Sequence, residues 1–170
     1  MVLMVFVNDL WRITDYPRRL GHAAAGEDFL GLADIVFPCF LFVVGMSIPY
    51  ALEGRYAKGK STTSTLSHIL TRSFALIVMG VFLVNTESGM SPDALLSAPV
   101  YKLLLLSAFF LIWNYRSKTW LEIIGLALLV FLGFVLKDRA GCCMSARWWG
   151  ILGLIGWSYL FCAVTYLFTR

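Results

Sequence analysis

The chain has 170 residues, of which 59% are hydrophobic and only 14% are charged. Soluble globular domains average about 25% charged residues, whereas the mean hydropathy here is +0.78. This composition excludes an ordinary water-soluble domain. The formal net charge of +4 is small, and the Lys and Arg residues lie in short segments between apolar blocks. We therefore expect no nucleic-acid partner, which would need a basic patch on an exposed surface.

The apolar residues form blocks that are long enough to cross a lipid bilayer. Residues 35–52 contain no charged side chain over 18 positions, and residues 148–169 contain none over 22. A hydrocarbon core about 30 Å thick needs roughly 20 residues of helix. The apolar runs are continuous and do not alternate, which excludes the pattern of a β-barrel. The sequence therefore predicts an all-α, polytopic transmembrane bundle whose main partner is the bilayer.

We expect about six helices, the first of them truncated. The first covers residues 1–7 and is followed by a polar loop over 8–28. The second spans 30–52, with Pro38 and Pro49 inside it, and a basic loop covers 53–67. Membrane helices tolerate such prolines because neighbouring groups satisfy the freed carbonyls. The third spans 68–84, an acidic loop follows over 85–92, and the last three helices are expected over 95–113, 119–136 and 148–168.

The loop charges give only a small preference for one orientation. Six Lys and Arg residues fall on each side of the expected membrane, and Arg72, near the start of the third helix, tips the count. Because positive charge is enriched in cytoplasmic loops, we expect the loop 53–67 in the cytoplasm. The loop 8–28 would then face the outside.

Four charged residues lie within the apolar blocks: Asp34, Arg72, Lys102 and Glu122. Ionisable groups at membrane depth are costly and often mark functional sites. The last three lie within about one turn of an expected helix end, where a long side chain can reach the interface. Asp34 is too short for that. We expect it to be either a site residue or the buried partner of a basic or amide side chain.

The remaining candidates for chemistry are histidines and cysteines. His22, one of two histidines, lies in the polar loop 8–28, and taken alone a loop histidine is most often a solvated surface residue. Cys39 and Cys162 lie inside apolar blocks, where cysteine behaves as a small hydrophobe. Cys142 and Cys143 are adjacent in a loop. Because no second Cys/His pair follows at a zinc-like spacing, we predict no metal site.

Several stretches resemble a known family. The most specific is Asp34-Ile35-Val36-Phe37-Pro38 with Phe40-Leu41-Phe42, preceded by Gly21-His22; weaker matches cover residues 5–8, 72–73, 80–85 and 149–157. Together they resemble a transmembrane acyltransferase family that includes lysosomal heparan-α-glucosaminide N-acetyltransferase and bacterial relatives. The spacing of twelve residues from His22 to Asp34 is longer than we expect in the lysosomal enzyme.

The resemblance implies an activity and a site. Members of this family move an acetyl group from acetyl-CoA to an amino sugar across the membrane, and His22 matches the position of their catalytic histidine. Imidazole is largely neutral at pH 7, so it can act as a general base toward an amine or accept the acetyl group itself. We expect Asp34, Asp28 or Glu27 to orient the ring. The expected substrate-binding residues are Asn8, Asp9, Glu27, Asp28 and Asn85.

The family pattern also includes parts that these residues lack. Its first helix opens with an Asp-x-x-Arg-Gly motif, and about five helices follow the sixth. We therefore expect residues 1–170 to form one transmembrane domain of a longer, about eleven-helix, multi-pass protein of a bacterial inner membrane. We expect the fragment alone to be inactive. Whether the protein forms a homodimer is left open. Two alternatives remain: a transporter subunit, suggested by the proline-containing helices and Asp34, and a non-catalytic membrane fragment.

Overall fold

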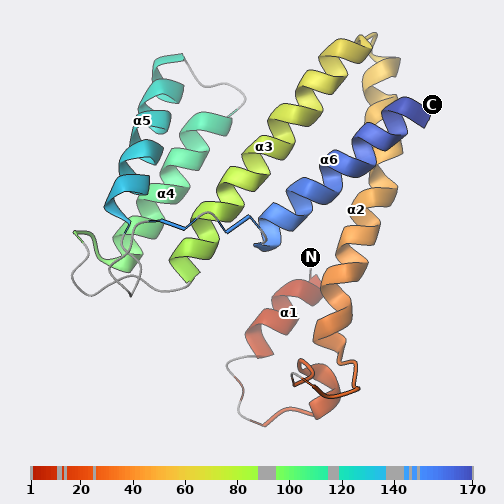
Figure 1. Cartoon of the computed structure of the whole chain (residues 1–170), viewed down its shortest axis with the longest axis vertical. Coiled ribbons are helices and arrows are strands. Elements are labelled where there is room, and N and C mark those ends of the chain that lie inside the picture. The colour runs from red at the N-terminus through yellow and green to blue at the C-terminus, as the bar shows by residue number, and fades with distance from the viewer. Residues whose placement is uncertain are drawn as a thin grey trace. The chain divides into compact units, whose positions relative to one another are not determined.

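A computed structural model describes residues 2–10, 13, 15–24, 26–87, 95–114, 119–136, 144–145, 147–148 and 150–169. Every regular element in these residues is a helix, which confirms the predicted class (Figure 1). The order is α1 (Val2–Leu10), a short 3-10 helix η1 (Arg18–Leu20), α2 (Leu32–Ala57), α3 (Thr62–Glu87), α4 (Ala98–Trp113), α5 (Thr119–Val135) and α6 (Ile151–Thr169). Cys142 and Cys143, which were expected in a loop, lie outside the described residues.

The predicted basic loop over 53–67 is wrong, because most of these residues are helical. Helix α2 continues to Ala57 and α3 begins at Thr62. Both helices extend past their apolar runs into polar sequence. The backbone N–H of Ser64 donates to Oγ of Ser61 over 3.3 Å, so Ser61 caps the first turn of α3 as serine commonly does.

Three further boundaries differ from the prediction. Asn8 and Asp9 were expected in the polar loop but lie in the last turn of α1. Asn85 was expected in the acidic loop but lies in α3, buried at 4% exposure. Arg72 was expected within one turn of a helix start, yet it follows the first residue of α3 by ten positions. The common cause is that apolar runs locate helix centres better than helix ends.

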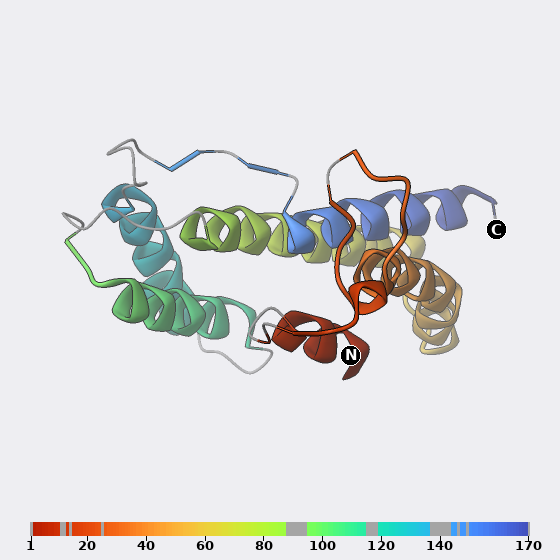
Figure 2. The same cartoon turned by 90° about the horizontal axis from the view of Figure 1, so that it is seen from below.

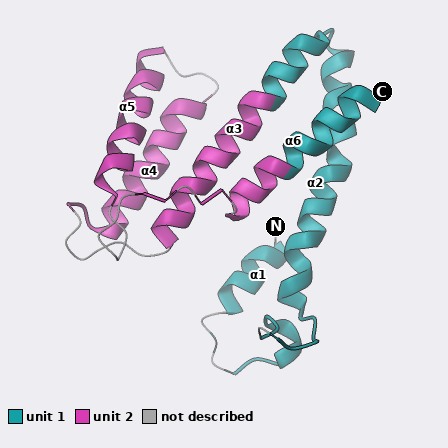
Figure 3. Ribbon diagram, in the orientation of Figure 1, with its two compact units in different colours: residues 1–69, 158–170 teal, residues 70–157 magenta. Residues whose placement is uncertain are grey.

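The chain divides into two compact units, coloured separately in Figure 3. Unit 1 comprises residues 1–69 and 158–170, and its core joins α2, the start of α3 and the end of α6. Helix α1 and η1 both contact α2 (Figure 2). Tyr166 of α6 donates a hydrogen bond to Glu53 of α2 over 2.8 Å. The buried core residues of this unit are Ile48, Leu52, Ile69, Tyr159 and Ala163.

Unit 2 comprises residues 70–157, and in it α4 and α5 lie side by side. The Tyr101 hydroxyl is buried between them and donates to the Leu132 carbonyl over 3.1 Å. Helices α3 and α6 approach closely at two glycines, since a Cβ on Gly80 would come within 2.5 Å of the backbone nitrogen of Gly153. Small residues at helix crossings of this kind are typical of membrane proteins.

The surface of the helices is apolar. Three helices, α2, α3 and α6, are long and apolar enough to cross a membrane by length and composition, and α4 and α5 are shorter apolar helices. Large side chains point outward from them: Phe42 is 69% exposed, Phe134 84% and Phe161 65%. Exposed apolar surface on this scale is unstable in water and stable in lipid. The chain is therefore a membrane protein.

Candidate active site

The two residues predicted to be catalytic meet at the N-terminal end of α2. Nδ1 of His22 lies 2.7 Å from Oδ1 of Asp34, a normal hydrogen-bond distance. His22 is in the segment between η1 and α2, and Asp34 is in the first turn of α2. The imidazole is 58% exposed and the carboxylate 24%. His22 and Asp34, twelve positions apart in the sequence, are therefore in direct contact.

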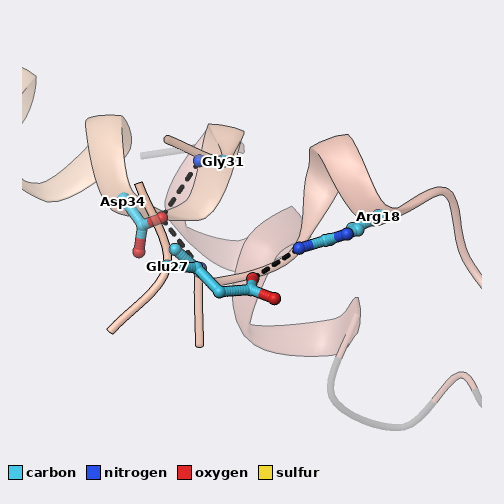
Figure 4. A network of polar contacts seen from close by, with 5 residues as sticks. Arg18, Glu27, Gly31 and Asp34 are labelled. Atoms are coloured by element: carbon cyan, nitrogen blue, oxygen red, sulfur yellow. Dashed lines mark hydrogen bonds and ion pairs between the residues drawn. The ribbon is translucent and has the colours of Figure 1, made fainter. Parts of the chain in front are cut away.

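Asp34 holds this segment through its second oxygen as well. Oδ2 accepts the backbone N–H of Gly31 over 3.0 Å and the backbone N–H of Ala23 over 3.1 Å. Figure 4 shows the bond from Gly31 to Asp34 at the start of the helix. A carboxylate in the first helical turn also interacts favourably with the positive end of the helix dipole. Asp34 therefore caps α2 and positions the histidine at the same time.

Gly31 and Gly21 bring the two ends of the segment together. The backbone carbonyl of Gly21 lies so close to Gly31 that a Cβ on Gly31 would overlap its oxygen. Gly21 is covered by the ring of Tyr16, since a Cβ there would be 2.7 Å from Cε2. This close approach places His22, the next residue after Gly21, beside the start of α2. Any side chain at Gly31 would force the backbone at Gly31 and the backbone at Gly21 apart.

A second ion pair holds the other side of the loop. Nη2 of Arg18 lies 2.5 Å from Oε2 of Glu27 (Figure 4). The Arg18 guanidinium also lies over the ring of Phe29, 5.3 Å from its centroid. Of the three acids expected to orient His22, Asp34 does so, whereas Glu27 is paired with Arg18. Asp28 lines a shallow hollow of about 450 Å³ together with Arg18, Arg19, Glu27 and Phe29.

A small recess opens beside the imidazole. It has a volume of about 220 Å³ and lies between α1, the loop and the start of α2. Its lining is mostly apolar, with Tyr16 and His22 as its polar side chains; the lining residues are Val7, Leu10, Tyr16, Leu20, Gly21, His22 and Ala33. Tyr16 and Gly31 were not predicted as site residues. A tyrosine or glycine in a polar loop carries no periodic signal from which this role could be deduced.

The arrangement determines which nitrogen of His22 is available for chemistry. An ionised carboxylate only accepts hydrogen bonds, so Nδ1 must carry the proton in the pair with Asp34. In the neutral imidazole the lone pair is then on Nε2. This is the arrangement in which a histidine serves as a base or nucleophile while an acid fixes its tautomer and orientation.

The other expected substrate-binding residues are Asn8 and Asp9 on α1 and Asn85 on α3. Asn8 and Asp9 are exposed on α1 and are not among the described residues that line the recess. Asn85 belongs to unit 2, where Nδ2 donates to the carbonyls of Val81 and Ser145 and Oδ1 accepts from the backbone N–H of Ser145. These contacts favour a structural role for Asn85. Its binding of substrate stays a prediction, as does that of Asn8 and Asp9.

The fold and the site define a class, and comparisons with known proteins narrow it. The class is a helical membrane protein with a carboxylate-held imidazole at the end of a candidate membrane span. The chain is 36% identical over 92 residues to heparan-alpha-glucosaminide N-acetyltransferase of Mus musculus. It is 35% identical over 92 residues to the enzyme of the same name from Homo sapiens. The predicted resemblance to this family is thereby confirmed over part of the chain.

These similarities are partial. The aligned residues make up 54% of this chain and 13% of each relative. No protein-family model matches the chain. No solved structure matches it either.

Proposed function

We propose that the protein is a membrane acyltransferase that moves an acetyl group from acetyl-CoA to the amine of an amino sugar, with His22 as its catalytic residue. The observation that carries the proposal is the 2.7 Å contact between His22 and Asp34, in a chain with partial similarity to two N-acetyltransferases. We further propose a multi-pass topology in a bacterial inner membrane, with the His22 loop on the non-cytoplasmic side.

Two routes use the free Nε2 of His22. In the first, Nε2 takes the proton of the amine while the amine nitrogen bonds to the acetyl carbon, and the thioester C–S bond breaks with CoA leaving as the thiolate. In the second, Nε2 itself bonds to the acetyl carbon as the thiolate leaves. The amine then attacks the acetyl carbon of the acetyl-imidazolium, the bond from that carbon to Nε2 breaks, and the proton of the amine passes to the freed Nε2. In both routes Asp34 keeps the proton on Nδ1 and stabilises the positive charge that develops on the ring.

The recess is too small to hold both substrates, so we assign it only the reacting groups. Pockets for drug-sized ligands usually enclose about 300–1,000 Å³, and this one encloses about 220 Å³. It is large enough for an acetyl group and the reacting edge of a sugar. The nucleotide part of acetyl-CoA needs other residues for its binding.

The structure weakens the reason for proposing a transporter. That alternative depended on Asp34 at membrane depth and on helices broken by proline. Asp34 lies in the first turn of α2 and is hydrogen-bonded to His22 and to two backbone N–H groups. Pro38 and Pro49 lie inside α2, which continues through both of them.

The proposed function is tested by acetyl transfer in membranes that contain the full-length protein to which residues 1–170 are expected to belong. With isotopically labelled acetyl-CoA and glucosamine, we expect labelled N-acetylglucosamine at a rate that Asp34→Asn lowers about tenfold or more, because an amide can hold the wrong imidazole tautomer. Glu53→Gln is the matched control, since Glu53 is an exposed acid of α2 that bonds to Tyr166 of α6, outside the His22 loop, and it should retain most of the rate. Equal rates in the wild type and Asp34→Asn, or no transfer by a folded wild type, would contradict the proposal.

A further inference from the structure

An apolar groove lies between α1 and α2, and its lining residues neighbour those of the His22 recess on both helices. On α1, Leu3 and Met4 line the groove, and Val7 and Leu10 line the recess. The spacing of these four residues places them on one face of the helix. The groove and the recess are therefore successive parts of one surface of unit 1.

The α2 side of the groove is entirely apolar. Its lining begins at Leu32, next to the recess residue Ala33, and continues through Ile35, Val36 and Cys39 to Phe40 and Val43. The groove has a volume of about 280 Å³. It remains open, since Leu3 is 57% exposed and Val43 is 61% exposed.

The length of the groove matches one leaflet of a bilayer. Leu32 and Val43, the first and last lining residues on α2, are eleven residues apart, which is about 16 Å along a helix axis. This is close to half of a hydrocarbon core of about 30 Å. Helix α2 is one of the helices long and apolar enough to span the membrane. The polar pair of His22 and Asp34 lies at one end of the groove, and only apolar side chains follow from there into the span.

We propose that this groove binds the hydrocarbon tail of the acceptor, so that the acceptor is an amino sugar carried on a lipid. The polar head of such an acceptor would lie at His22 and its apolar tail between α1 and α2. Its polarity would then match that of the surface along its whole length. Each buried methylene of the tail adds to binding, and the membrane holds such an acceptor at the depth of the site. This inference rests on the proposed acetyl transfer and adds the substrate class.

The test compares a short-chain and a long-chain acceptor in proteoliposomes. The wild type should acetylate dodecyl glucosaminide with a kcat/KM at least about tenfold above that for methyl glucosaminide. Cys39→Trp fills the groove and should lower the kcat/KM for the dodecyl compound to the value for the methyl compound. Met46→Trp is the matched control, because Met46 is an exposed residue of α2 (57%) that does not line the groove. Partitioning of the dodecyl compound into lipid is the same for every variant.

A labelling experiment separates this inference from the proposed function. A glucosaminide with a photoreactive diazirine at its chain end should label α1 and α2 residues of the groove in the wild type and in Met46→Trp. Labelling should be lost in Cys39→Trp and in a second groove-filling variant, Leu3→Trp. Labelling without acetyl transfer would support the groove while overturning the proposed function. If acetyl transfer occurs but Cys39→Trp does not alter the preference for the dodecyl compound, the groove does not bind the tail of the acceptor. The proposed function would still stand in that case.

A competition experiment tests whether the groove binds the tail of the acceptor or the tails of bilayer lipids. Excess dodecyl glucosaminide should suppress labelling, and dodecyl phosphocholine at the same concentration should not. If both compounds compete equally, the groove holds the tails of bilayer lipids and the inference about the acceptor is wrong. Equal labelling of Met46 and the groove would also contradict it.

Discussion

Replacing His22 by alanine is expected to lower the rate of acetyl transfer about 100- to 10,000-fold, which is the usual contribution of a positioned general base. The side chain supplies the only free imidazole nitrogen at the recess among the described residues. Because it is 58% exposed, its loss should leave the folded state nearly as stable as before. The rate is measured as labelled N-acetylglucosamine formed in membranes with equal amounts of protein.

His68→Ala provides the matched control for this variant. His68 is an exposed residue of α3, outside the His22 loop. Its replacement should change the rate less than about twofold. If His22→Ala retained the wild-type rate in protein of unchanged thermal stability, His22 could not be the catalytic residue.

Gly31→Ala is expected to lower the rate by about 100-fold, because a displacement of about 1 Å in a catalytic group can have that effect. A Cβ on Gly31 would overlap the carbonyl oxygen of Gly21, so the segment that carries His22 must move away from α2. The expected signature is a fall in the transfer rate together with increased proteolysis between η1 and α2, measured by limited digestion in proteoliposomes.

Gly54→Ala separates this effect from a general effect of alanine. Gly54 lies in α2, the helix that begins directly after its N-cap residue Gly31, and a Cβ on Gly54 meets nothing within 4 Å. Alanine favours helix relative to glycine, so this variant should be at least as stable as the wild type and equally active. Equal activity of Gly31→Ala and Gly54→Ala would show that the approach of Gly21 to Gly31 is not needed for the reaction.

The positions of the helices along the chain were predictable to a large extent. Continuous apolar blocks without charges located the centres of α2 and α6, and Pro38 and Pro49 were correctly placed inside α2. The helix ends were less predictable. Glu53 and Arg55 are good helix formers, so α2 continues into polar sequence where hydropathy indicates a loop. Ser61, the cap of α3, was the available signal for the true start of that helix.

His22 and Asp34, which meet in the candidate site, could be singled out from the sequence, but the residues that hold them together could not. A lone acid next to an apolar run indicated Asp34, and the family resemblance indicated His22. Their contact depends on the path of the loop between them. That path is determined by the close approach of Gly21 to Gly31 and by Tyr16 on Gly21. These contacts join residues five and ten positions apart in an irregular loop, and no periodicity or spacing in one sequence encodes them.

The central claim is that His22 and Asp34 act as one unit, and a double-mutant cycle tests it most directly. Acetyl transfer is measured for the wild type, His22→Ala, Asp34→Asn and the double variant in the same membranes. Because Asp34 acts on the reaction through the imidazole, the double variant should be no slower than His22→Ala alone. If the two losses instead multiply, the residues act independently, and the account of a carboxylate-held catalytic histidine is wrong.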